Sequence, residues 1–105
     1  MATYNLTLEG EQGLVRLSGN LTAVIVPDLQ KDLKQMLSEG ARTLIFDLSD
    51  TAMLDSSGIG LLIAALNSVA QVRGEVRVTN VAPEIFRLLQ HMRLTTRLIV
   101  SARAA

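Results

Sequence analysis

The sequence contains no cysteine, no tryptophan and only two prolines. The absence of cysteine excludes disulfides, thiolate metal sites and thiol catalysis, and it suits a reducing compartment. Residues 1–5 show no basic stretch followed by an apolar one, so no secretory signal peptide is predicted. We therefore expect a cytoplasmic protein.

Aromatic residues are scarce, since Tyr4, Phe46 and Phe86 make up only 3% of the chain. The core must be aliphatic, and a platform on which bases or sugars could stack is not available. The formal net charge is zero, and the arginines of the second half are scattered over several predicted elements with no lysine among them. This pattern is typical of solvated surfaces, so we predict no direct contact with nucleic acid.

Long hydrophobic runs are missing as well. The longest uncharged segment, residues 56–72, is interrupted by Asn67, Ser68 and Gln71. A helix that crosses a bilayer needs about 20 mostly apolar residues. The segment therefore predicts a buried helix and no membrane span.

A length of 105 residues with 49% hydrophobic and 19% charged residues is typical of one folded unit, so residues 1–105 are predicted to form a single domain. Alternating or short apolar runs predict strands, and apolar residues at a spacing of three and four predict helices. The predicted strands are 3–9, 14–18, 43–48, 75–79 and 98–100. The predicted helices are 27–39, 59–72 and a third that begins at Pro83 and carries Ile85, Leu88, Leu89 and Met92 on one face.

Helices between successive strands require crossover connections, which favour parallel pairing. The first two predicted strands are joined by a short turn and form an antiparallel hairpin. The sequence therefore predicts an α/β fold with a mixed sheet. Residues 49–58 are predicted to be a loop.

The densest polar segment is residues 55–60, with the sequence Asp-Ser-Ser-Gly-Ile-Gly. Asp55 or Ser56 would cap the helix that follows by accepting its free N–H groups. Capping does not explain Gly58 and Gly60, each of which costs about 0.8–1 kcal/mol relative to alanine inside a helix. Small residues here either let a partner's backbone approach or permit tight packing inside the domain, and the sequence leaves both open.

Autonomous catalysis is not supported. Ser57 lacks the glycine two residues before it that a nucleophile elbow needs, and His91, the single histidine, falls within the third predicted helix. One histidine without cysteine or locally spaced carboxylates gives no metal site. No Lys-Ser/Thr pair follows Gly58 and Gly60, so a nucleotide-binding loop is absent. We predict no enzyme activity, no metal and no cofactor.

A serine that receives a phosphate needs only exposure and a suitable neighbourhood, which Ser57 has at the start of a helix. A phosphate of charge about −1.5 to −2 is favoured there by the helix dipole. It would turn a docking surface of small residues into a bulky and negative one.

Three segments carry a family resemblance. They are the run that begins with residues 45–49 and continues through residues 53–62, the Gly-Asn-Leu-Thr turn at 19–22, and Val-Thr-Asn-Val at 78–81. They resemble the STAS domain of bacterial anti-sigma factor antagonists over nearly the whole chain. The resemblance implies a small STAS-like domain with a four- to five-stranded mixed sheet and helices packed mainly on one face.

The resemblance also implies partner switching. The unphosphorylated form would bind an anti-sigma factor that is also a serine kinase. Phosphorylation of Ser57 would release that partner, and a serine phosphatase would reset the cycle. The implied docking residues are Asn20, Thr22, Asp55, Ser56, Gly58, Ile59 and Gly60. Where family members often have Gly-Glu-Leu-Asp, this chain has two neutral residues, Asn20 and Thr22.

Two alternatives predict different behaviour. As a constitutive subunit of a cytoplasmic complex, such as a lipid-transport or other signalling assembly, the chain would use Ser57 only as a helix-capping residue. As a hydrolase using Ser57 and His91, it would be active without ATP or a partner.

Overall fold

The computed structural model describes residues 3–103. Five strands form one sheet: β1 (Thr3–Glu9), β2 (Gln12–Ser18), β3 (Thr43–Asp47), β4 (Glu75–Val81) and β5 (Ile99–Ala102). Three α-helices connect them, namely α1 (Val26–Ser38), α2 (Ser56–Ala70) and α3 (Pro83–His91), together with a short 3₁₀-helix, η1 (Leu94–Thr96). The predicted mixed α/β sheet is confirmed.

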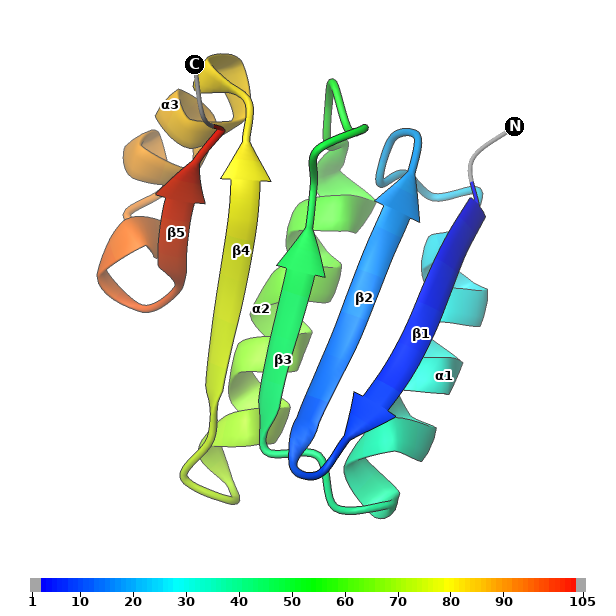
Figure 1. Cartoon of the computed structure of the whole chain (residues 1–105). Helices are drawn as coiled ribbons and strands as arrows, with labels where there is room; N and C mark the ends of the chain where they lie inside the picture. The colour runs from blue at the N-terminus through cyan, green and yellow to red at the C-terminus, as the bar shows by residue number, and fades with distance from the viewer. Residues whose placement is uncertain (1–2, 104–105) are drawn as a thin grey trace.

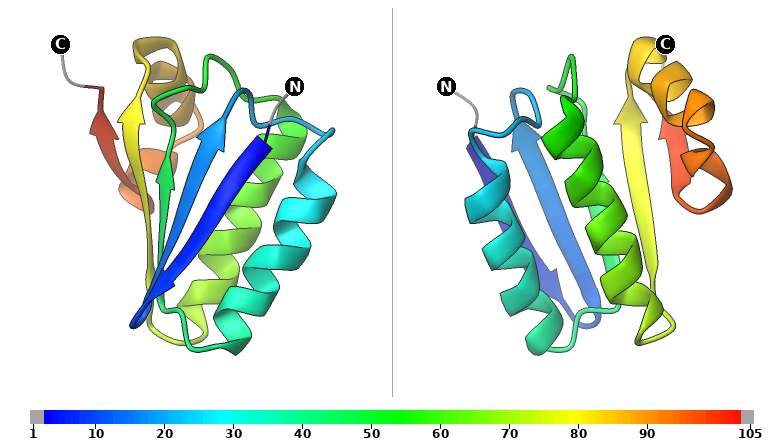
Figure 2. Two further views of the ribbon diagram at one scale, coloured as in Figure 1. Left: turned by 45° about the vertical axis from the view of Figure 1, so that its right-hand side comes forward. Right: turned by 180° about the vertical axis from the view of Figure 1, so that it is seen from behind.

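The strands lie in the order β1-β2-β3-β4-β5 (Figure 1). The β1–β2 pair is antiparallel and the remaining pairs are parallel. Each crossover from β2 onward leads to the next strand along the sheet, and crossovers of this kind are right-handed. Repeated right-handed crossovers in one direction place every helix on the same face, and Figure 2 shows α1, α2 and α3 together there.

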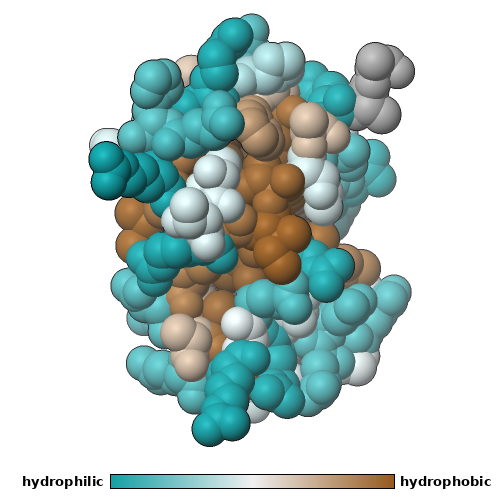
Figure 3. All heavy atoms as spheres, turned by 90° about the vertical axis from the view of Figure 1, so that its left-hand side faces the viewer, coloured by the Kyte–Doolittle hydropathy of each residue, from teal (hydrophilic) through white to brown (hydrophobic). Residues whose placement is uncertain are grey.

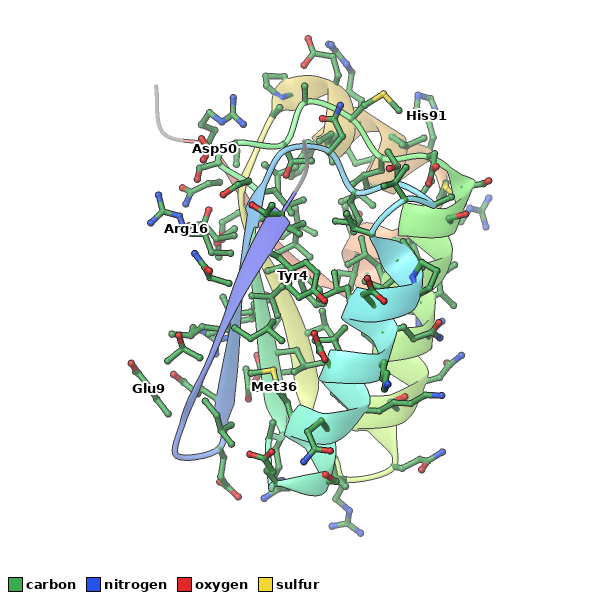
Figure 4. All side chains as sticks on the ribbon, turned by 90° about the vertical axis from the view of Figure 1, so that its right-hand side faces the viewer. Tyr4, Glu9, Arg16, Met36, Asp50 and His91 are labelled. Carbon is green, nitrogen blue, oxygen red and sulfur yellow. The ribbon has the colours of Figure 1, made fainter. Side chains whose placement is uncertain are left out.

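The core lies between this face of the sheet and the helices. It is aliphatic apart from Phe46, which is fully buried on β3. Figure 4 shows Tyr4 and Met36 on the helical side of the sheet and Arg16 on the opposite side. The Tyr4 hydroxyl donates to Asp32 of α1 at 2.7 Å, and burial together with this carboxylate raises the pKa of Tyr4 to about 12.

Several predicted boundaries need correction. The second strand begins at Gln12 instead of residue 14, and the last strand is Ile99–Ala102 instead of 98–100. The placement of Met92 on the apolar face of the third helix is wrong, because α3 ends at His91 and Met92 lies beyond it, exposed. The chain then passes through a left-handed residue, Arg93, into η1, which the sequence pattern did not predict.

The largest correction concerns the start of α2. Residues 56–58 were predicted to belong to a loop, with the helix beginning at residue 59. The helix begins at Ser56, because Asp55 caps it there, and it ends at Ala70. The predicted site residues therefore occupy the first turns of a helix.

Candidate functional site

The polar segment 55–60 lies at one end of the sheet, beside the turn that joins β2 to α1. Leu21 in this turn and Leu54 in the loop after β3 form an isolated parallel bridge. Leu21 N–H donates to the Met53 carbonyl and Asp55 N–H donates to the Leu21 carbonyl, each at 3.3 Å. The two connections are therefore joined through their backbones.

Asn20 strengthens this junction. Its side-chain oxygen accepts from the backbone N–H groups of Ala52 at 3.0 Å and Met53 at 3.1 Å. The Thr51 hydroxyl, which is completely buried, donates to the Gly19 carbonyl at 2.8 Å. The side-chain oxygen of Asn20 thus links the turn after β2 to the loop after β3.

Asp55 connects the same turn to α2. One carboxylate oxygen accepts from Gly58 N–H and the other from Ala23 N–H, both at 2.9 Å. These two backbone hydrogen bonds hold the pKa of Asp55 below its ordinary value. Asp55 is therefore ionised at neutral pH, and it is both the N-cap of α2 and a clamp on the turn.

The two glycines of the segment have opposite surroundings. A Cβ atom on Gly58 would lie 2.3 Å from the Leu21 carbonyl oxygen, so the first turn of α2 packs directly on the backbone of the turn. A Cβ atom on Gly60 would meet nothing within 4 Å. Of the two explanations left open by the sequence, internal packing accounts for Gly58, whereas Gly60 is exposed.

The serines occupy the first two positions of α2. Ser56 is exposed and Ser57 is half-buried, and within residues 3–103 neither hydroxyl makes a hydrogen bond to another part of the chain. Ile59 is half-buried beside them, and Thr22 is half-buried in the turn. The structure therefore brings all eight predicted site residues to one end of the molecule.

Three contributors to this end were missed by the sequence reasoning. Val24 and Met53 are exposed on the turn and the loop although both are apolar. The guanidinium of Arg103 donates to the Leu48 carbonyl at 3.1 Å, which secures the start of the loop from the far end of the chain. Nothing in the local sequence signals a contact of such long range.

His91 makes no hydrogen bond with Ser57 in the described part of the chain. It is exposed at the end of α3 (Figure 4). Residues 3–103 contain no group of three metal-ligating side chains of the histidine, cysteine or carboxylate type. Among the helices of the same residues, none has the length and apolar character needed to cross a membrane.

A second concave surface lies on the face of the sheet away from the helices. It encloses about 320 Å³, and its polar lining includes Asn5, Arg16, Asp47 and Thr79. Burial opposes ionisation of Asp47, but hydrogen bonds from Asn80 and Ser49 outweigh it and lower the pKa. No predicted site residue lies on this face.

A comparison of the chain with known protein families finds a match. Residues 4–101 match the model of a family described as "Mlab, STAS domain". The chain belongs to the STAS domain family. The predicted resemblance is thereby confirmed.

Relatives of this STAS domain include regulatory proteins. It is 30% identical over 76 residues to the anti-sigma-B factor antagonist of Staphylococcus aureus, which corresponds to 72% of this chain and 70% of the relative.

Solved structures support the fold of the STAS domain. Unphosphorylated SpoIIAA, an anti-sigma factor antagonist, has a TM-score of 0.75 at 22% identity, covering 84% of this chain and 82% of SpoIIAA. The phosphorylated form of Bacillus SpoIIAA has a TM-score of 0.78 at 21% identity, covering 93% and 90%. The sheet with helices on one face is therefore the fold of these proteins.

Proposed function

We propose that this STAS domain is an anti-sigma factor antagonist that switches partners when Ser57 is phosphorylated. The unphosphorylated form binds an anti-sigma factor that is also a serine kinase, and the phosphorylated form is released. A serine phosphatase restores binding. The cycle takes place in the cytoplasm, and the chain itself catalyses no step.

The observation that carries the proposal is the pair of hydroxyls at the start of α2. Within residues 3–103 the hydroxyls of Ser56 and Ser57 make no hydrogen bond, and the two serines lie in the first turns of α2 with exposed Gly60. A serine retained only to cap the helix would not be needed here, because Asp55 already accepts from Gly58 N–H. The hydroxyl of Ser57 is thus available to a kinase.

Phosphorylation would alter the surface more than the fold. The helix dipole favours a negative group at the N-terminus of α2. The carboxylate of Asp55 is fixed by Ala23 and Gly58 and adds repulsion toward an incoming negative group of a partner. SpoIIAA, whose structures in unphosphorylated and phosphorylated forms share this fold, offers a precedent for a STAS domain that exists in both states.

Phosphosite mapping tests the switch. The wild-type chain, Ser57→Ala and Ser56→Ala are incubated with host-cell extract and Mg-ATP and examined by mass spectrometry. We expect a phosphate on Ser57 in the wild type and in Ser56→Ala, and none in Ser57→Ala. If no chain is phosphorylated in an extract that phosphorylates other proteins, the constitutive-subunit alternative takes the place of the switch.

Binding measurements test the consequence of the phosphate. Ser57→Asp should bind the kinase about tenfold or more weakly than Ser57→Ala, because a charge at a desolvated interface costs several kcal/mol when it is unpaired. Ser68→Asp, on the last turns of the same helix, adds the same charge away from the site and should bind as the wild type does. Equal affinities of Ser57→Asp and Ser57→Ala would disprove the proposed mechanism.

A further inference from the structure

Two of the exposed large hydrophobic side chains of the structure belong to the segments that are hydrogen-bonded to the start of α2. Val24 on the turn is 80% exposed and Met53 on the loop is 47% exposed. Exposed apolar side chains are common singly, but a group of them beside a functional group marks a contact surface. Their position therefore requires an explanation that core packing does not give.

The hydrogen bonds of the site join the segments that carry Val24 and Met53. Met53 N–H donates to Asn20 and the Met53 carbonyl accepts from Leu21 N–H, so Met53 lies against the turn. Val24 follows Ala23, whose N–H donates to Asp55. The turn, the loop and the first turn of α2 thus form one hydrogen-bonded unit that carries Val24, Met53 and Ser57.

This unit has almost no charge. Among residues 20–24 and 51–60, Asp55 is the single charged residue, and both of its carboxylate oxygens accept backbone N–H groups. Exposed Ala23, Ala52 and Gly60 extend the uncharged surface. Long-range attraction of a basic partner would need unengaged carboxylates, and segments 20–24 and 51–60 contain none; the carboxylate nearest to them in the loop is that of exposed Asp50.

We propose that Val24 and Met53 are the specificity-determining contacts of the docking surface, and that the kinase presents to them an apolar recess without basic side chains. This inference rests on the proposed function and specifies the chemistry of the partner. Desolvated apolar side chains at the centre of an interface supply most of its affinity.

The same chemistry explains why phosphorylation would release the partner. A basic recess would pair with a phosphate on Ser57 and hold the domain more tightly. An apolar recess offers the phosphate no pairing and removes its water, which is strongly unfavourable. A neutral surface around Ser57 is therefore suited to release on phosphorylation.

Other exposed apolar residues lack these neighbours. Val72, 44% exposed, follows the C-terminal end of α2, which at 1.5 Å per residue lies about 20 Å from Ser57. Ile99 belongs to the β5 edge, where Figure 3 shows an apolar area bordered by polar groups. Val72 is thus remote from the hydrogen-bonded unit, Ile99 belongs to a strand outside that unit, and both provide controls.

The test uses the kinase isolated on immobilised Ser57→Ala chain and verified by its phosphorylation of Ser57 in the wild type. Its Kd is measured by calorimetry for Val24→Asp, Met53→Asp, Val72→Asp and Ile99→Asp, after circular dichroism has shown that each variant is folded. We expect the first two to weaken binding about tenfold or more, and the last two to change it less than about twofold. Raising NaCl from about 50 to 500 mM should change the wild-type Kd less than about threefold, because few ion pairs are formed.

Four results would overturn the inference. Wild-type affinity of Val24→Asp and Met53→Asp, with Ser57 still phosphorylated, would refute the apolar contact and leave the proposed function intact. A Kd that rises tenfold or more with salt would show a basic partner surface. If sedimentation of the chain alone shows self-association that Val24→Asp abolishes, the surface binds a second copy instead. The absence of any Ser57 kinase would refute the proposed function itself, and the inference with it.

Discussion

The two ends of α2 are built with similar devices but leave different groups exposed. At the N-terminal end Gly58 lies under the Leu21 carbonyl, and beyond the C-terminal end Gly74 lies under the Arg42 carbonyl, where a Cβ atom would be 1.9 Å from the oxygen. At the far end Arg42 donates from Nε and Nη2 to the Val72 carbonyl at 3.1 and 2.8 Å. Within residues 3–103 the hydroxyls of Ser56 and Ser57 at the N-terminal end and of Ser68 near the C-terminal end make no side-chain hydrogen bond, so the ends differ in what surrounds these hydroxyls.

The comparison separates what builds the fold from what marks a site. A glycine under a neighbouring backbone and an exposed valine occur at both ends of α2. Close packing at a glycine is therefore a property of the fold. What distinguishes the N-terminal end, where we propose the functional site, is that two adjacent hydroxyls, those of Ser56 and Ser57, lie beside a turn and a loop with exposed apolar side chains.

The largest expected effect on stability comes from adding a methyl group at the two packed glycines. Gly58→Ala and Gly74→Ala should each lower the free energy of unfolding by about 1–3 kcal/mol, because the new Cβ meets backbone oxygen instead of a movable side chain. Denaturant unfolding measures both changes.

Gly60→Ala is the matched control for these variants. Its Cβ meets nothing within 4 Å, so helix propensity should raise the free energy of unfolding by about 0.5–1 kcal/mol. Destabilisation by Gly60→Ala, or none by Gly58→Ala, would contradict the assignment of one glycine to packing and the other to the surface.

A smaller effect is expected when the clamp at the N-terminal end is removed. Asp55→Asn leaves one acceptor oxygen for two N–H groups, those of Ala23 and Gly58, and should lower the Tm. Because the pKa of Asp55 is lowered in the folded chain, its contribution is present above the unfolded pKa and is lost as pH falls through the folded pKa.

The pH dependence provides the measurement. The difference in Tm between wild type and Asp55→Asn should be constant near neutrality and shrink below about pH 4, the usual range of an aspartate. Asp50→Asn, at an exposed loop position, removes a carboxylate without touching the clamp and serves as the control variant. If the Tm of the wild type exceeded that of Asp55→Asn by a larger margin at lower pH, the proposed clamp would be ruled out.

The smallest effect is expected at the C-terminal end. Arg42→Met removes two exposed hydrogen bonds to the Val72 carbonyl and should lower the free energy of unfolding by about 0.5 kcal/mol. Binding of the kinase should be unchanged, since this end lies about 20 Å from Ser57. A loss of affinity in this variant would remove the functional distinction between the two ends of α2.

Much of the fold could be predicted from local pattern. Alternation in residues 3–9 and the stripe of Leu29, Leu33 and Met36 are local signals, and the structure has a strand and a helix there. The start of α2 was predicted three residues too late. Asp55 as the cap was one of two possibilities, and the pattern of apolar residues becomes regular only after Gly58.

The candidate site was located but not understood from the sequence. The position of Ser57 before a glycine and at a helix start could be recognised locally. The sequence could not show that the Asn20 side chain accepts hydrogen bonds from the loop backbone, or that Val24 and Met53 are exposed. Both facts depend on contacts between segments about thirty residues apart.

The sequence by itself determined the element types, the aliphatic core and the serine at the start of a helix, because these follow from short-range periodicity and residue chemistry. The tertiary structure alone decided which glycine packs and which faces outward, and which apolar residues remain outside the core. Those outcomes depend on how the turn at 20–24 and the loop at 51–55 meet, and only the folded sheet brings these segments together.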